Sequence, residues 1–118
     1  MIRIAIVEDD DAYRRQLVDF LKRYESESGE SFRLSLFSDG MEIVQDYRSE
    51  YDIILMDIEM RYMDGMTAAE RIRKLDMEVV IIFITNMSQY VMKGYTVDAM
   101  DFVLKPITYY AFSQRIDR

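Results

Sequence analysis

The sequence predicts an α/β domain in which a parallel sheet of five strands is covered by helices on both faces. Short apolar runs alternate along the chain with segments whose apolar residues recur every three or four positions, the spacing of an amphipathic helix. Most of the runs are apolar throughout, as expected of strands buried on both faces of a parallel sheet. The 118 residues, half of them hydrophobic, suffice for one core and predict one domain.

The first predicted strand covers residues 2–7, an apolar run that ends where four acidic residues, 8–11, begin. An amphipathic helix is predicted after it, because five large side chains follow at helical spacing: Tyr13, Leu17, Phe20, Leu21 and Tyr24. Asp10 or Asp11 is the predicted N-cap, since a short carboxylate side chain accepts hydrogen bonds from the first free backbone amides. Residues 26–31 are polar and predict a loop.

The second strand is predicted at residues 32–36, where Phe32, Leu34 and Leu36 alternate with polar residues as in a half-exposed edge strand. Asp39-Gly40 predicts a turn into a short helix. The remaining predicted elements are a strand at 52–56, a helix at 67–75, a strand at 79–84, a helix at 88–99, a strand at 102–104 and a helix that starts near 109. No helix-ending signal precedes Arg118, which predicts that the last helix is cut from a longer chain.

The composition excludes several classes of chemistry. The chain has no histidine and no cysteine, so disulfides, thiolate zinc sites and Ser-His-Asp catalysis are ruled out. The formal net charge of -7 argues against direct binding of nucleic acid by this segment. The apolar runs are too short to span a membrane and no signal peptide is visible at the N-terminus. A soluble, cytoplasmic protein is expected.

Acidic and polar residues follow the predicted strands. Glu8 and Asp9 follow the first strand, Asp57 the third, Thr85 the fourth and Lys105 the fifth. In an open parallel sheet, binding sites form outside the carboxyl ends of the strands, so we expect these side chains to share one crevice. Three carboxylates at close range repel each other unless a cation lies among them. Ligands that are all oxygen favour Mg²⁺, with Mn²⁺ as the second choice.

Lys105 precedes Pro106, the only proline of the chain. A cis bond before this proline would turn the chain and direct the lysine ammonium over the strand ends. An ammonium and the Thr85 hydroxyl, placed beside a metal ion, form a binding site for a phosphoryl group. Asp57 is then the candidate nucleophile, because a carboxylate can accept a phosphoryl group and form an acyl phosphate.

Four motifs together resemble those of response-regulator receiver domains of two-component signalling: VEDD at 7–10, MDIEM at 56–60, FIT at 83–85 and DFVLKP at 101–106. The resemblance covers essentially the whole chain. It implies that residues 1–118 form one receiver domain with the flavodoxin-like (βα)₅ fold and the strand order 2-1-3-4-5. It also implies a signalling domain rather than an enzyme, one that catalyses its own phosphorylation and dephosphorylation, with a sensor histidine kinase as its partner.

The resemblance assigns the metal and the phosphoryl group to particular residues. Asp57 is the implied phosphoacceptor, and it binds Mg²⁺ together with Glu8 and Asp9. The backbone carbonyl of Glu59 is implied to complete the metal site. Lys105 is implied to contact the phosphoryl group.

By the same resemblance, Thr85 contacts the phosphoryl group and acts with Phe102 as a switch. Phosphorylation would then change the surface formed by the fourth helix, the fifth strand and the fifth helix, and this surface would form a homodimer or release an output domain. The segment 98–112, DAMDFVLKPITYYAF, looks most like receivers joined to LytTR-type DNA-binding domains that control transcription. Such an output domain is absent from this chain.

Two positions depart from the family pattern, and two other functions stay open. Arg61 stands where receivers commonly have proline, and Asn86 stands where a small residue is frequent. The first alternative is a pseudo-receiver that binds proteins without being phosphorylated, which Asn86 would favour. The second is a small Mg²⁺-dependent aspartyl phosphatase. Taken alone, Glu8 and Asp9 could simply be the acidic N-terminus of a helix.

Overall fold

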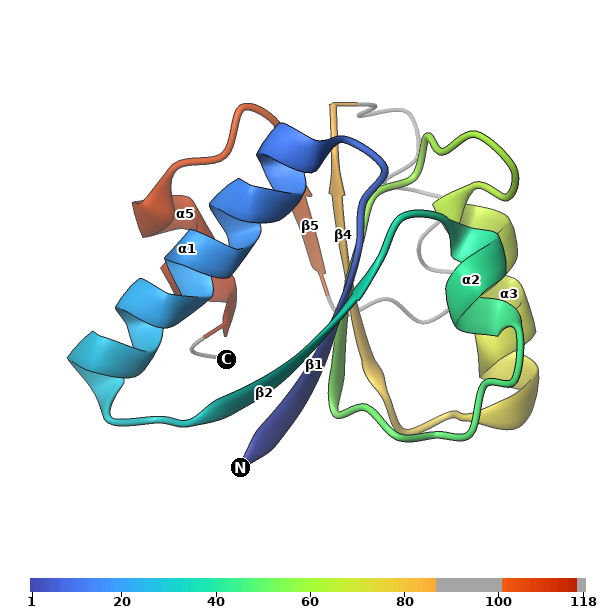
Figure 1. The fold of residues 1–118 in the computed structure, drawn as a ribbon, viewed down its shortest axis with the longest axis horizontal. Coiled ribbons are helices and arrows are strands. Elements are labelled where there is room, and N and C mark those ends of the chain that lie inside the picture. The colour runs from blue at the N-terminus through green and yellow to red at the C-terminus, as the bar shows by residue number, and fades with distance from the viewer. Residues whose placement is uncertain (87–100, 117–118) are drawn as a thin grey trace.

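The computed structural model describes residues 1–86 and 101–116 (Figure 1). The helix predicted at 88–99 lies outside the described residues. The strands are β1 (Ile2–Val7), β2 (Phe32–Phe37), β3 (Ile53–Met56), β4 (Val80–Thr85) and β5 (Asp101–Leu104). The helices are α1 (Asp11–Ser28), α2 (Gly40–Val44), α3 (Gly65–Leu75) and α5 (Tyr109–Ile116).

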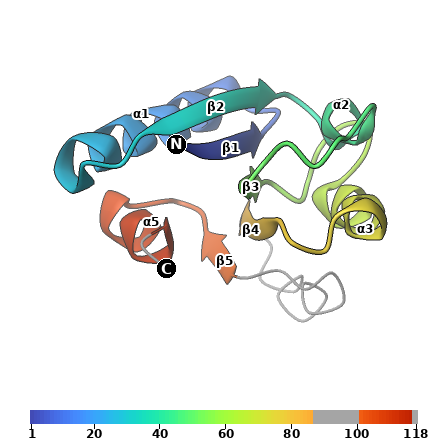
Figure 2. The same ribbon diagram turned by 90° about the horizontal axis from the view of Figure 1, so that it is seen from below.

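The five strands form one parallel sheet in the order β2-β1-β3-β4-β5. Helices α1 and α5 cover one face of this sheet, and α2 and α3 cover the other (Figure 2). The carboxyl ends of the strands all lie at the edge where α1 begins, which is at the top of Figure 1. The predicted fold class and strand order are therefore confirmed.

The core consists of two apolar layers, one on each face of the sheet. Successive strand residues point to opposite faces, so Ala5 and Val7 pack toward α2 and α3, whereas Ile4 and Ile6 pack toward α1 and α5. The strands β3 and β4 divide their side chains in the same way. Burial on both faces explains why these strands are continuous apolar runs in the sequence.

The ends of α1 show why one predicted boundary was wrong. Asp10 is the N-cap, and its carboxylate accepts hydrogen bonds from the backbone amides of Ala12 (2.8 Å) and Tyr13 (3.1 Å). The helix continues through residues 26–28, which the polar composition had assigned to a loop. The Ser28 hydroxyl donates to the Tyr24 carbonyl (2.7 Å), and Gly29, with φ of 80°, ends the helix in the left-handed conformation that suits glycine.

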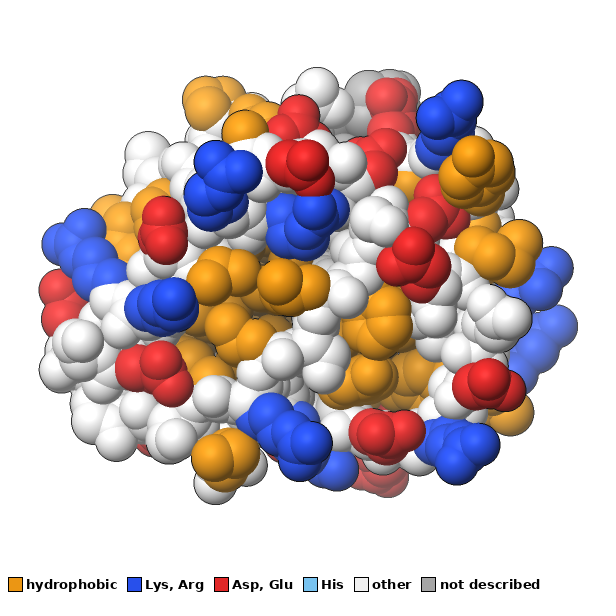
Figure 3. Space-filling model, viewed as in Figure 1, with side chains coloured by type: hydrophobic (Ala, Val, Ile, Leu, Met, Phe, Trp, Pro, Cys, Tyr) orange, Lys and Arg blue, Asp and Glu red, His pale blue; other side chains and the backbone are white. Residues whose placement is uncertain are grey.

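The edge strand departs from the predicted alternation near its end, where Ser35 is half-buried and Leu36 is 52% exposed. Phe32 and Leu34 pack against the core that α1 covers, as predicted. On the face shown in Figure 3, acidic and basic side chains are interspersed around an apolar area. Among the residues that the structure describes, no helix has the length and apolar character needed to cross a membrane.

Candidate functional site

The sheet brings the residues that follow β1 and β3 side by side. Val7 pairs with Met56 in the register of these two strands, so the next residues, Glu8 and Asp57, are neighbours. The Asp57 amide donates a hydrogen bond to the Val7 carbonyl (3.0 Å). Both side chains are buried, with 1% of Glu8 and 7% of Asp57 exposed. Two carboxyl groups therefore lie at the strand ends where water can solvate them only in part.

Three carboxyl groups meet at this edge. Glu8, Asp9 and Asp57 each place one carboxylate oxygen within 4.8 Å of the others, and Asp9 is the exposed member of the group. An all-oxygen cluster of this size fits a hard divalent cation that keeps part of its water shell, as Mg²⁺ does. The structure thus brings together the three predicted carboxylate ligands. The Glu59 side chain is exposed, and the role of its carbonyl stays a prediction.

Lys105 extends from the end of β5 into the acidic cluster. Its Nζ lies 2.7 Å from Glu8 Oε1 and 3.4 Å from Asp57 Oδ2, and only 10% of its side chain is exposed. The Lys105 amide donates to the Thr85 carbonyl (2.9 Å), and the Lys105–Pro106 bond is cis. One ammonium among three carboxylates leaves an excess of two negative charges, which a divalent cation would balance.

The Asp57 backbone packs closely against the start of α3. Asp57 Oδ1 accepts a hydrogen bond from the Ile58 amide (2.8 Å), and the Ile58 carbonyl accepts one from Gly65 (2.7 Å). A Cβ atom at position 65 would lie 3.0 Å from the Asp57 carbonyl carbon and closer still to its oxygen. Glycine is therefore the residue that lets α3 begin against the candidate nucleophile.

Asp39 holds the loop that follows Asp57, and the sequence did not indicate this role. Its carboxylate is buried and accepts hydrogen bonds from the amides of Met41 (2.9 Å), Tyr62 (2.9 Å) and Met63 (3.0 Å). The first bond caps α2, which the Asp39-Gly40 pair predicts. The other two come from residues 23 and 24 positions away, so no local pattern could have revealed them.

Burial changes the proton affinity of the cluster. It is the largest effect on the carboxyl groups, and it raises the pKa of Asp57, Glu8 and Asp9 because the charged form loses water. The neighbouring Lys105 opposes this increase at Asp57 and Glu8 but does not cancel it. Burial alone would lower the pKa of Lys105, but its hydrogen bond to Glu8 and the charges of Asp57 and Glu8 outweigh burial and raise it.

We expect Mg²⁺ binding to weaken as the pH falls, starting at a higher pH than for ordinary carboxyl groups, because protons and Mg²⁺ compete for the cluster. The contribution of the cluster to the stability of the metal-free protein should instead increase as the pH falls. A carboxyl group whose pKa is raised by folding contributes stability below its unfolded-state pKa, and this contribution is lost as the pH rises through its folded-state pKa. Lowering the pH through that window should therefore let the cluster stabilise the metal-free protein.

Thermal unfolding with and without Mg²⁺ over a series of pH values measures both effects. The increase in Tm caused by Mg²⁺ should be largest at neutral pH and should shrink in acid. Asp52→Asn is a suitable control, because Asp52 is exposed at the other edge of the sheet and its hydrogen bond to Arg3 lowers its pKa. An effect of Mg²⁺ that does not change with pH would contradict the assignment of the cluster as the metal site.

The two predicted switch residues lie on the neighbouring strands. Thr85 is the last residue of β4 and is fully buried. Phe102 is half-buried on β5 and packs against Phe83, with ring centroids 5.3 Å apart. Asn86 and Arg61, the two departures from the family pattern, are both exposed. A switching role for Thr85 and Phe102 stays a prediction.

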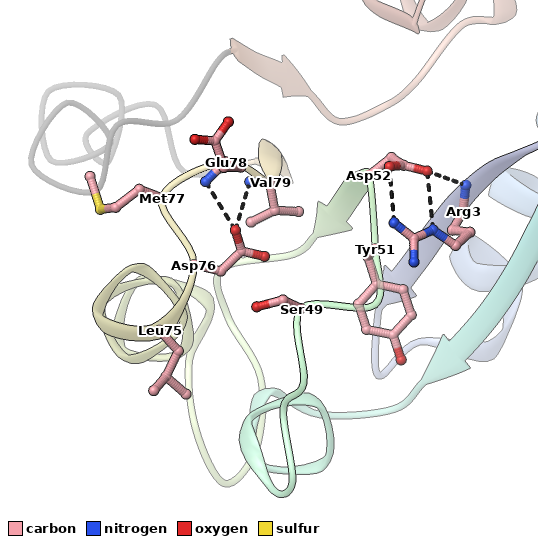
Figure 4. A pocket seen from close by; sticks show the side chains of 9 residues that line it. All are labelled: Arg3, Ser49, Tyr51, Asp52, Leu75, Asp76, Met77, Glu78 and Val79. Carbon is pink, nitrogen blue, oxygen red and sulfur yellow. Dashed lines mark hydrogen bonds and ion pairs between the residues drawn. The ribbon is translucent and has the colours of Figure 1, made fainter.

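The opposite edge of the sheet has a hollow of about 750 Å³ near the amino ends of β1, β3 and β4 (Figure 4). Two of its charged side chains pair with each other, and a third accepts hydrogen bonds from the backbone. Arg3 Nη2 lies 3.3 Å from Asp52 Oδ1, and Asp76 Oδ1 accepts hydrogen bonds from the amides of Glu78 (2.9 Å) and Val79 (3.1 Å). Among the described residues, this hollow has no cluster of three carboxylates like the one at the other end of the strands.

Comparison with known proteins shows which proteins this chain resembles over nearly its whole length. The model of the family described as response regulator receiver domain matches residues 4–117. The sensory transduction protein LytT of Bacillus subtilis (strain 168) is 32% identical over 108 residues, which are 90% of this chain and 43% of LytT. The sensory transduction protein LytR of Streptococcus agalactiae is 27% identical over 95% of this chain and 44% of LytR. The chain thus spans less than half the length of both relatives.

Solved structures agree with this match. The non-phosphorylated HemR receiver domain from Leptospira biflexa has a TM-score of 0.86 and 25% identity, over 100% of this chain and 93% of that one. A chain in the CheX-CheY-BeF₃-Mg²⁺ complex from Borrelia burgdorferi has a TM-score of 0.84 and 27% identity, over 98% of this chain and 86% of that one.

Proposed function

The chain belongs to the response regulator receiver domains of two-component signalling, and on this premise we propose that Asp57 accepts a phosphoryl group and thereby controls an attached output. One observation supports the proposal most strongly. The carboxylates of Glu8, Asp9 and Asp57 meet at the strand ends, and the Lys105 ammonium lies among them. This is the set of charges needed to place a phosphoryl group against a carboxylate nucleophile.

The residues of the site have different roles in phosphoryl transfer. An Asp57 oxygen forms a bond to phosphorus as the bond between phosphorus and the donor nitrogen breaks, and the leaving imidazole takes a proton from water. The Ile58 amide holds Asp57 Oδ1, which fixes the carboxylate plane. Lys105 is close enough to Asp57 to donate to an oxygen of the incoming group. Mg²⁺ bound by Glu8, Asp9 and Asp57 would neutralise charge on the phosphoryl oxygens.

The proposed physiological donor is a phosphohistidine outside this chain. These 118 residues contain no histidine, and we propose that a sensor histidine kinase supplies the phosphoryl group. A small donor such as acetyl phosphate isolates the chemistry of the domain from the choice of kinase. Intact mass after incubation with acetyl phosphate should show one phosphoryl adduct with Mg²⁺ and none when Mg²⁺ is chelated. No adduct under either condition would favour a pseudo-receiver instead.

We further propose that phosphorylation changes the surface that includes β5 and α5. Thr85 ends the strand next to β5, and Phe102 lies on β5 itself, so a movement at Thr85 is transmitted directly to this surface. The output is proposed to be a DNA-binding domain of the LytTR type that controls transcription, since LytT and LytR are among the relatives and both are more than twice as long as this chain.

The surface can be tested on the domain itself. Beryllofluoride with Mg²⁺ imitates an aspartyl phosphate without being hydrolysed. Sedimentation velocity should then show a shift from monomer to homodimer when both are added, and Asp57→Asn should not shift. An unchanged sedimentation coefficient over a wide concentration range would contradict dimerisation and leave release of the output domain as the switching step.

A further inference from the structure

The Lys105 ammonium has a third contact besides Glu8 and Asp57. Its Nζ lies 4.0 Å from the ring centroid of Tyr13, within the distance of a cation–π interaction. Tyr13 belongs to the first turn of α1, so the ammonium is held by residues from three places in the chain: α1, the end of β1 and the end of β3. The sequence pattern had indicated Tyr13 only as part of the apolar stripe of α1.

We propose that Tyr13 is a positioning residue for phosphoryl transfer. Its ring keeps the Lys105 ammonium over the acidic cluster while the hydrogen bonds of Lys105 change partners. The inference rests on the proposed function of Asp57. Lys105 now donates to Glu8 and Asp57, and its ammonium has to shift when a phosphoryl group is added to the Asp57 carboxylate that it contacts. An ammonium has three N–H donors, and a ring face attracts its charge without requiring any of them to be redirected from oxygen.

The backbone of Tyr13 is held by the turn that forms the acidic site. The Tyr13 amide donates to Asp10 Oδ1 (3.1 Å), and the Asp10 amide donates to Glu8 Oε2 (3.2 Å). Arg14, the next residue of α1, donates from Nη1 to the Glu8 carbonyl (2.6 Å). The start of α1 is therefore tied to Glu8 at two points, which holds the backbone that carries the Tyr13 ring next to the acidic cluster.

Tyr13 also separates Lys105 from an open groove. A hollow of about 270 Å³ between α1 and the segment after β5 is lined by Ala12, Tyr13, Gln16, Pro106 and Ile107. Lys105 is not part of this lining, and its side chain is 90% buried although its neighbour Pro106 is exposed. A smaller side chain at position 13 would let water reach the Lys105 ammonium from the groove. This would weaken the interactions of the ammonium with Glu8 and Asp57.

The test separates the charge of the ring face from its bulk. Tyr13→Phe keeps the ring and its attraction for a cation, since the ring and not the hydroxyl contacts Lys105. Tyr13→trifluorophenylalanine keeps the shape but withdraws electrons from the ring face. The rate of adduct formation from acetyl phosphate at saturating Mg²⁺ is measured for each. We expect Tyr13→Phe to stay within about twofold of the wild type and the fluorinated variant to be slower than Tyr13→Phe by about five- to tenfold.

Two further readouts decide how a change in rate is interpreted. Mg²⁺ affinity should be unchanged in both variants, because the ring contacts Lys105 and not a carboxylate, and Tm should be equal in both because their shapes match. Equal rates for the two variants would overturn the inference while leaving Asp57 as the acceptor. No adduct on the wild-type protein would overturn the proposed function, and the inference with it.

Discussion

Asp57→Asn is expected to abolish uptake of the phosphoryl group from acetyl phosphate, to below about 1% of the wild-type adduct. The asparagine amide has nearly the same shape but is not a nucleophile, and it gives the divalent cation one charged ligand fewer. Because the asparagine carbonyl oxygen can still accept the hydrogen bond from the Ile58 amide, the substitution should leave the fold intact. Intact mass spectrometry after incubation with Mg²⁺ and acetyl phosphate measures the result.

The same variant should be more stable than the wild type when no metal is present at neutral pH. Burial and the repulsion between Glu8 and Asp57 oppose ionisation in the cluster, and the amide removes one of the repelling charges. Asp52→Asn is the matched control, since this exposed aspartate should keep full phosphoryl uptake and gain no stability. An adduct of normal yield on Asp57→Asn would show that another residue is the acceptor.

Asp39→Ala is expected to cause the largest loss of stability that a single polar side chain of this site can produce. Its carboxylate satisfies three backbone amides, those of Met41, Tyr62 and Met63, and it is only 5% exposed. A buried donor left without a partner costs about 1–3 kcal/mol. Water entering the site would satisfy some of the three, so we expect the free energy of unfolding to fall by roughly 3 kcal/mol or more.

Two other substitutions should cause smaller losses in the free energy of unfolding. Asp39→Asn keeps the oxygen that serves Met41 and Met63 and loses the bond to Tyr62, so it should cost about 1–2 kcal/mol. Asp64→Ala removes one exposed N-cap bond, to the Thr67 amide, and should cost about 1 kcal/mol. Urea unfolding of the four proteins gives the comparison. Equal losses for Asp39→Ala and Asp64→Ala would show that the loop at 61–64 does not depend on Asp39.

The fold could be predicted from the sequence because each strand of the sheet interior is buried on both faces. Residues 53–56 and 80–84 are therefore apolar without interruption, and the helix between them shows helical spacing. The rule that parallel strands present their carboxyl ends at one edge then placed Glu8, Asp9, Asp57 and Lys105 together. The structure agrees with that placement, because Lys105 Nζ lies within hydrogen-bond distance of Glu8 Oε1.

The contacts that hold the site in place could not be predicted in this way. Asp39 has the sequence context of an ordinary turn, and its two decisive donors lie more than twenty residues away. Tyr13 fits the apolar stripe of α1, and its contact with Lys105 depends on how the start of α1 meets the end of β5. The C-terminal end of α1 was misplaced because serine and glutamate suit exposed helical turns as well as loops.

The central claim, that Asp57 receives the phosphoryl group, is tested most directly by finding the modified residue. An acyl phosphate is reduced by borohydride to the alcohol, so a phosphorylated aspartate becomes homoserine. Peptide mass spectrometry after phosphorylation with Mg²⁺ and acetyl phosphate, followed by reduction, locates that change. We predict homoserine at position 57 and nowhere else. Homoserine at Asp9 or at another aspartate, or an adduct that borohydride does not reduce, would contradict the claim.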